Sequence, residues 1–136
     1  MSKGNTAEND FIAYTFNATA FSWNGNSNLY ISLHTADPGE GGNQTTSECA
    51  YGSYARQAVA RNSGGWTVSG NQASNAALIQ FPEASSGSET ITHVVIGTSS
   101  SGTGQILYSG ALNSSRSVST GIQPQFAIGA LTITED

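Results

Sequence analysis

The chain has 136 residues and a formal net charge of −5, and charged residues make up only 10% of it. This length suits one domain spanning residues 1–136. Four cationic side chains spread along the chain cannot form the basic stripe that a phosphate backbone requires, so we expect no nucleic-acid partner. No run approaches the roughly twenty apolar residues of a membrane span, so we expect no membrane partner either.

Residues 1–20 are the segment for which the sequence predicts a helix. Thr6 is the expected N-cap, and Glu8 and Asp10 follow in the first turn, where the helix dipole favours negative charge. Helical spacing then places four residues on one stripe: Phe11, Ile12, Thr15 and Phe16. A helix this short is marginal alone, so its stripe must dock either on its own β-domain or on a neighbouring subunit.

Beyond residue 20 the apolar residues follow a period of two, which is typical of strands. Leu29, Ile31 and Leu33 alternate with more polar residues, which predicts a strand buried on one face. Further strands are expected at 54–60, 65–69, 76–81, 90–97, 105–109, 116–119, 125–128 and 130–134. Val94, Val95 and Ile96 form a continuous apolar run, which indicates a central strand. The fold class is therefore all-β, a two-sheet β-sandwich with jelly-roll or Greek-key order and one short N-terminal helix.

Residues 35–53 form a long loop that opens with an Asp37-Pro38-Gly39 turn. Asp37, Glu40 and Glu48 are hard oxygen donors, but their spacing matches no calcium loop, so we expect no metal site. Cys49 is the only cysteine, which excludes an intrachain disulfide. We interpret it either as a small buried side chain or as an unused thiol of the loop.

No residue pattern indicates catalysis. His34 ends a strand with Ser32 before it and Asp37 after it, but no G-x-S-x-G or comparable nucleophile motif accompanies them. His34 and Asp37 are more simply turn residues that hydrogen-bond local backbone. We therefore expect no catalytic residue, no cofactor and no enzyme activity.

The aromatic residues allow two interpretations, stacking platforms for a sugar or caps on the ends of the core: Trp23, Trp66, Tyr30, Tyr51, Tyr54 and Tyr108. Trp66 is in phase with Val68, which favours the core. Tyr51 and Tyr54 flank Gly52 at the end of the long loop and are better candidates for an exposed contact.

The segments Leu33-His34-Thr35-Ala36-Asp37-Pro38-Gly39 and Tyr54-Ala55-Arg56 resemble a family of small tailed-phage virion proteins. Members of this family are usually labelled tail-fibre or head-decoration proteins. The resemblance implies a cement protein that clamps the outside of the head shell. The N-terminus, Met1 to Asp10, is polar and has no apolar stretch of signal-peptide type, so we expect synthesis in the host cytoplasm. The expected partners of such a cement protein are the major capsid protein and further copies of itself, as a dimer or trimer. The alternatives are a tail-fibre or minor tail component, or a receptor-recognition module that binds a host glycan.

Partner contacts are expected from the N-terminal segment and the long loop, at Phe11, Ile12, Phe16, Asp37, Glu40, Glu48, Tyr51, Tyr54 and Arg56. Arg56 could link to a carboxylate across an interface. An intramolecular pair with Glu48 or Asp37 is the alternative for the same side chain.

Overall fold

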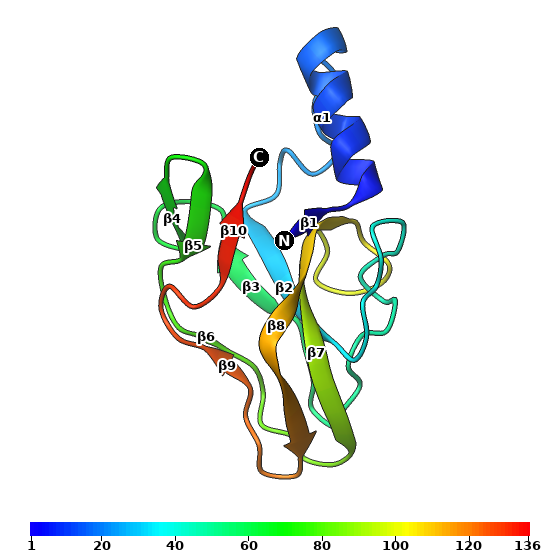
Figure 1. Ribbon diagram of the computed structural model, residues 1–136, viewed down its shortest axis with the longest axis vertical. Helices are drawn as coiled ribbons and strands as arrows, with labels where there is room; N and C mark the ends of the chain where they lie inside the picture. The colour runs from blue at the N-terminus through cyan, green and yellow to red at the C-terminus, as the bar shows by residue number, and fades with distance from the viewer.

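The computed structural model describes residues 1–136 and consists mostly of β-strands in three antiparallel sheets, with one helix, α1 (Asn5–Asn17) (Figure 1). The main sheet has five strands in the order β1-β8-β7-β2-β3. Their bounds are β1 (Ser2–Lys3), β8 (Ile106–Ser119), β7 (Ser88–Gly97), β2 (Asn28–His34) and β3 (Gln57–Ala60). The predicted all-β, sandwich-like fold is confirmed.

Two small sheets lie across the core from the main sheet. One has the order β10-β5-β4, with β4 (Trp66–Ser69), β5 (Gln72–Asn75) and β10 (Thr132–Thr134). The other pairs β6 (Ile79–Gln80) with β9 (Gln125–Phe126). The second layer expected of the sandwich is therefore divided into two short pieces.

The core is a cluster of buried side chains contributed by all three sheets. Fourteen residues form it: Ile31, Leu33, Cys49, Tyr51, Trp66, Ile79, Phe81, Ala84, Ile91, Val94, Ile96, Val118, Leu131 and Ile133. Trp66 belongs to it as expected, but Val68, whose phase with Trp66 suggested this, is 73% exposed near the β4–β5 turn. The run Val94 to Ile96 lies in β7, which has β8 on one side and β2 on the other, so the central position predicted for it is confirmed.

Three strands differ from the sequence prediction. β1 lies in the segment 1–20 that was expected to be helical, and it pairs with β8 instead. β5 was not expected, because its residues Gln72–Asn75 are polar or small; it forms by pairing with β4 across a tight turn where Gly70 has φ +60°. The two strands expected at 105–109 and 116–119 are one strand, β8, whose register against β7 shifts between Ile91 and His93. That irregularity lets one strand continue through a polar stretch that resembles a loop in sequence.

The long loop covers the outer face of the second half of β2, so residues 31–34 of this strand are buried on both faces rather than one. Gln44 of the loop is buried and exchanges hydrogen bonds with backbone Ser99, at 3.2 Å to its carbonyl and 2.9 Å from its N–H. Its side chain occupies the space that a Cβ would need at Gly97 and Gly104. The two glycines therefore provide the space into which the loop packs.

No helix of the chain is long and apolar enough to cross a membrane.

Candidate functional site

Helix α1 leaves the β-body at Gly4 and is fixed there by backbone hydrogen bonds. The N–H of Gly4 donates to the carbonyl of Leu107 at 3.0 Å, and the N–H of Asn5 donates to that of Glu40 at 2.9 Å. A Cβ at Gly4 would overlap the carbonyl oxygen of Ile106, so glycine alone lets the helix begin this close to β8. The prediction that Thr6 is the N-cap was wrong, because the cap is Gly4, which has no side chain to accept a hydrogen bond.

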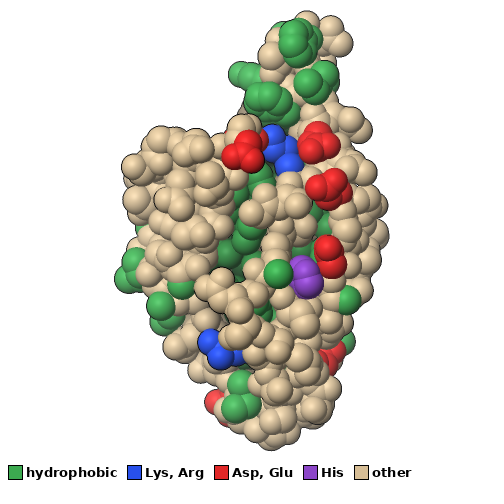
Figure 2. Space-filling model, viewed as in Figure 1, with side chains coloured by type: hydrophobic (Ala, Val, Ile, Leu, Met, Phe, Trp, Pro, Cys, Tyr) green, Lys and Arg blue, Asp and Glu red, His purple; other side chains and the backbone are tan.

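The rest of α1 projects from the β-body, and its apolar side chains remain uncovered (Figures 1 and 2). Only Ala7 of this helix is buried, whereas Phe11, Ile12, Tyr14 and Phe16 are all exposed. The expectation that the stripe could dock on its own β-domain was therefore wrong. At 100° per residue these four side chains point to several sides of the helix, with polar residues such as Asn9 and Thr15 between them, so α1 exposes apolar surface on more than one side.

Two of these side chains are partly covered by the chain itself. The ammonium of Lys3 lies 5.0 Å from the centroid of the Phe11 ring. Tyr14 stacks on Phe21 with ring centroids 5.1 Å apart. Ile12 and Phe16 lie one turn apart at i and i+4 on another face, and they are 56% and 74% exposed.

A stack of aromatic rings links α1 to the β-body. From Tyr14 it continues through Phe21 to Trp23 at 4.9 Å, and the guanidinium of Arg61 lies 4.9 Å above Trp23. Arg61 Nη1 also donates to the carbonyl oxygens of Trp23, Asn24 and Asn26. These contacts hold the segment after α1 against the end of β3, so the helix is tied to the β-body at Gly4 and Asn5 and, through Tyr14, near its other end.

The long loop contributes an interior ion pair rather than an exposed contact. Arg56 donates Nε and Nη2 to the two carboxylate oxygens of Glu48, at 2.7 and 2.9 Å, and its side chain is only 3% exposed. Nη1 donates to the carbonyl of Ser99 at 2.9 Å, and Nη2 also donates to the carbonyl of Gly102 at 2.6 Å. The intramolecular alternative for Arg56 is therefore the one observed, and the expectation that Arg56 and Glu48 contact a partner was wrong.

The two tyrosines of this loop were also wrongly expected to be exposed. Tyr51 is buried in the core, and burial raises the pKa of its phenol to about 12. Tyr54 donates its hydroxyl to Glu48 at 2.8 Å and accepts from the N–H of Leu33 at 3.1 Å. Desolvation raises the pKa of Tyr54 as well. The Tyr51 hydroxyl donates to the carbonyl of Pro82 at 2.9 Å, so the polar end of each ring has a partner within the chain.

Asp37 and Glu40 are exposed but do not assemble into a cation site. The carboxylate of Asp37 accepts the N–H of Gly39 at 2.9 Å, which is the local turn bond that the sequence predicted. Glu40 contributes its backbone carbonyl to the base of α1. Glu48, the third carboxylate of the loop, is held by Arg56. No group of three histidines, cysteines or carboxylates in the chain could hold a metal.

Ser32 and His34 form a buried hydrogen-bonded pair. Ser32 Oγ lies 2.8 Å from Nε2 of His34, and Nδ1 of the same ring lies 2.8 Å from the carbonyl of Thr46. Both residues are 0% exposed, and burial lowers the pKa of His34. The pair ties the long loop to β2, and Asp37 takes no part in it.

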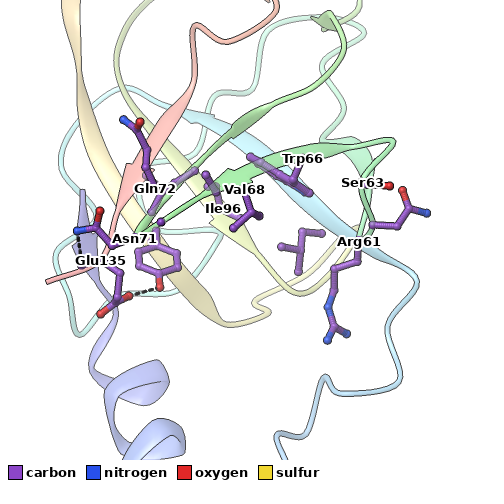
Figure 3. A pocket seen from close by; sticks show the side chains of 14 residues that line it. Arg61, Ser63, Trp66, Val68, Asn71, Gln72, Ile96 and Glu135 are labelled. Atoms are coloured by element: carbon purple, nitrogen blue, oxygen red, sulfur yellow. Dashed lines mark hydrogen bonds between the residues drawn. The ribbon is translucent and has the colours of Figure 1, made fainter.

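An open cleft of about 810 Å³ separates the main sheet from the β10-β5-β4 sheet (Figure 3). Its lining is apolar at the centre, with Leu29, Trp66, Val68, Ala73, Ile96, Tyr108 and Ile133. The hollow and its hydrophobic floor are visible at the centre of Figure 2. Arg61 lies at one end and Glu135 at the other, where Glu135 accepts from Tyr108 and pairs with Lys3 at 2.6 Å.

Sequence reasoning missed this cleft, because the cleft depends on the β4–β5 hairpin that forms one wall. The dipeptide Gly70-Asn71 is a two-residue hairpin turn signal and could have revealed that hairpin. Trp66 was expected in the core. Its position on the floor of the cleft, however, depends on how the β10-β5-β4 sheet packs against the main sheet, and these sheets are built from segments distant in sequence.

A comparison with protein-family models matches residues 2–134 to the family described as podophage GP4 fiber I protein gp80. The chain belongs to this fibre protein family. It is therefore a structural protein of a phage virion, which confirms the resemblance at that level. No curated protein matches the chain.

For a member of the fibre protein family, the relevant surfaces are those that can contact other chains. Of the residues predicted to make such contacts, Phe11, Ile12 and Phe16 are exposed and close together on α1. Asp37 and Glu40 are exposed on the long loop, and the backbone of Glu40 accepts a hydrogen bond from Asn5 at the base of the helix. Their role as partner contacts remains a prediction, whereas the four interior loop residues have structural roles.

Proposed function

We propose that this protein is a fibre subunit that assembles into the virion through the uncovered end of helix α1 and transforms no molecule. The observation that carries the proposal is the exposure of four large apolar side chains on a helix that projects from the β-body. An exposed apolar surface of this kind costs free energy in water and marks a site of protein contact. The description of the matched family supports the assignment to a fibre.

The absence of catalysis is part of the same proposal. The one arrangement that resembles catalytic machinery, Ser32 with His34, is completely buried beneath the long loop. A nucleophile must reach its substrate, so this pair acts as a structural tie between the loop and β2.

We expect protein partners rather than nucleic acid. Three of the four cationic side chains are engaged within the chain: Lys3 with Glu135, Arg56 with Glu48, and Arg61 with carbonyl oxygens and Trp23. Little positive charge remains for a phosphate backbone. Further copies of this chain and neighbouring virion proteins are the partners that we propose.

A head-decoration role on the outside of the capsid is the second candidate, with the major capsid protein as partner. The observation that favours it is the surface chemistry, because only 10% of the residues are charged and copies can pack closely with little repulsion. The copy number in purified virions separates the two roles, since hundreds of copies indicate head decoration and a small number indicates a fibre at the tail.

The test of the proposal is a phage that carries Phe16→Asp, with Ile128→Asp as the matched control. Phe16 is 74% exposed on α1 and Ile128 is 70% exposed on the β-body, so both changes place a charge on a comparably exposed apolar residue. We expect Phe16→Asp to reduce the amount of the protein in purified virions at least about tenfold, the effect of about 1.4 kcal/mol of lost contact. Unchanged incorporation of Phe16→Asp, measured by quantitative mass spectrometry, would refute the role of α1.

A further inference from the structure

We propose that the cleft between the main sheet and the β10-β5-β4 sheet binds the uncovered end of α1 from a second copy of this chain. The inference rests on the proposed function and deepens it, because it names the partner that α1 meets. The chain carries both halves of the contact: an apolar helix end without a cover and an apolar cleft without an occupant.

The helix presents its anchors at the spacing that grooves recognise. Ile12 and Phe16 lie one turn apart on the same face, the i and i+4 arrangement of helix-in-groove contacts. Two turns of helix, about 10 Å wide and about 11 Å long with side chains, occupy roughly 800 Å³. The cleft of about 810 Å³ therefore has room for one face of such a segment.

The occupant must come from another molecule. Hydrogen bonds at Gly4 and Asn5 fix the base of α1 to β8 and to the long loop, and stacking of Tyr14 on Phe21 supports its other side. From that base the helix points away from the β-body (Figure 1). A rigid helix held in this way cannot fold back into the cleft of its own chain.

The charges of the two surfaces are compatible with one orientation. Residues 11–17 of α1 carry no charge, and the last turn has no basic residue to meet its free carbonyl groups. Arg61 lies at one end of the cleft, and the hydrogen bonds it makes within the chain come from Nη1 alone. Its remaining N–H groups can meet the carbonyl end of the incoming helix, where a cation is favoured.

The buried area implies a weak contact. Ile12 and Phe16 together present roughly 250 Å² of apolar surface, and the whole uncovered helix end about 400 Å². A standard interface buries about 800 Å² on each partner, so this contact falls in the range of transient interfaces. We therefore expect association that depends on protein concentration, with a dissociation constant on the order of micromolar or weaker.

Because the helix of one copy meets the cleft of another, the two contacting surfaces differ. Such a contact closes if two copies exchange their helices, and it continues into a ring or a filament if each copy binds the next. In either arrangement every contact needs one intact helix and one intact cleft.

The test uses two variants of the full chain, Phe16→Asp on the helix and Val68→Glu on the wall of the cleft, with Ile128→Asp as control. Val68 is 73% exposed, so its replacement leaves the core unchanged, and circular dichroism with thermal melting verifies that each variant folds. Sedimentation velocity from about 1 µM to about 1 mM measures self-association. We expect Phe16→Asp and Val68→Glu each to weaken it at least about tenfold, and Ile128→Asp to leave it unchanged.

Mixing the two defective variants supplies the decisive measurement. Val68→Glu keeps an intact helix and Phe16→Asp keeps an intact cleft, so the mixture should form a one-to-one complex that neither variant forms alone. Direct packing of two helices would give no such complex, because Phe16→Asp lacks the helix surface.

The outcomes separate this inference from the proposed function. The inference is refuted if Val68→Glu self-associates like the unmodified chain, if no variant changes the association, or if the mixture stays monomeric. If Phe16→Asp is nevertheless lost from virions, α1 serves assembly through a different partner and the proposed function stands. If Phe16→Asp is retained in virions, the proposed function fails whatever the cleft binds.

Discussion

Replacing Arg56 by alanine should destabilise the fold more than any surface substitution, because Arg56 holds the long loop against the main sheet. The guanidinium makes two hydrogen bonds to Glu48 and one each to the carbonyls of Ser99 and Gly102. Its removal leaves the carboxylate of Glu48, whose side chain is 14% exposed, with the Tyr54 hydroxyl as its remaining donor. An uncompensated carboxylate in such a position is strongly unfavourable.

The expected loss is about 3 kcal/mol of unfolding free energy. Breaking a buried ion pair by removing one partner costs roughly 3–5 kcal/mol, and the slight exposure of Glu48 favours the lower end. For a chain of this length, such a loss lowers the melting temperature by about 10 °C. It is a large share of the roughly 5–15 kcal/mol that stabilises a typical domain.

Urea unfolding followed by tryptophan fluorescence measures this loss, with Arg116→Ala as the control. Arg116 is exposed on β8, and its replacement should change the free energy of unfolding by no more than about 0.5 kcal/mol. The double variant Arg56→Ala/Glu48→Ala should lose less than the sum of the two single variants, since no carboxylate is then stranded. A loss below about 1 kcal/mol for Arg56→Ala would refute the reading of this pair as the anchor of the loop.

Three further predictions follow from buried or crowded groups. Gly4→Ala should destabilise the chain by at least about 1 kcal/mol in urea unfolding, because its Cβ overlaps the carbonyl of Ile106, whereas Gly25→Ala, with open space around it, should not. Cys49 should resist a thiol reagent at about pH 8 until denaturant is added, because burial raises its pKa to about 12; rapid labelling of the folded chain would contradict this. Burial holds the folded-state pKa of His34 below the ordinary 6.5, so below that pH the unfolded chain binds a proton that the folded chain does not. Stability should therefore be complete above pH 6.5 and fall as the pH drops below it, and His34→Gln should flatten this part of the profile measured by urea unfolding at successive pH values.

The strands were predictable where apolar residues alternate with polar ones, or follow one another without interruption, along a short segment of the sequence. Leu29 to Leu33 and Val94 to Ile96 satisfied that condition, and both segments lie in the main sheet as expected. β5 did not satisfy it, because Gln72–Asn75 gains its strand conformation from pairing with its neighbours on either side, β4 and β10. Local pattern carries no signal for a strand whose stabilisation comes from its partners.

The residues that were predicted to contact a partner also divide into a group that the sequence placed correctly at the surface and a group that it did not. Apolar side chains on a short helix were identified as needing a partner, and Phe11, Ile12 and Phe16 are exposed on α1. The loop residues Tyr51, Tyr54 and Arg56 were assigned to the surface because a polar, glycine-rich loop usually lies there. In the fold the loop crosses β2 and packs against it, so the polar groups of these three side chains form hydrogen bonds within the protein.

By itself the sequence determined an all-β protein with one N-terminal helix, a low surface charge and the residues of a phage virion protein, because periodicity and composition are local properties of a chain. Only the tertiary structure decided that the helix projects without a cover, that Arg56 and Glu48 meet inside, and that an apolar cleft opens between two sheets. Each of these features depends on contacts between segments distant in sequence, such as Arg56 with Gly102 and Gly4 with Leu107, whose geometry is fixed when the sheets pack.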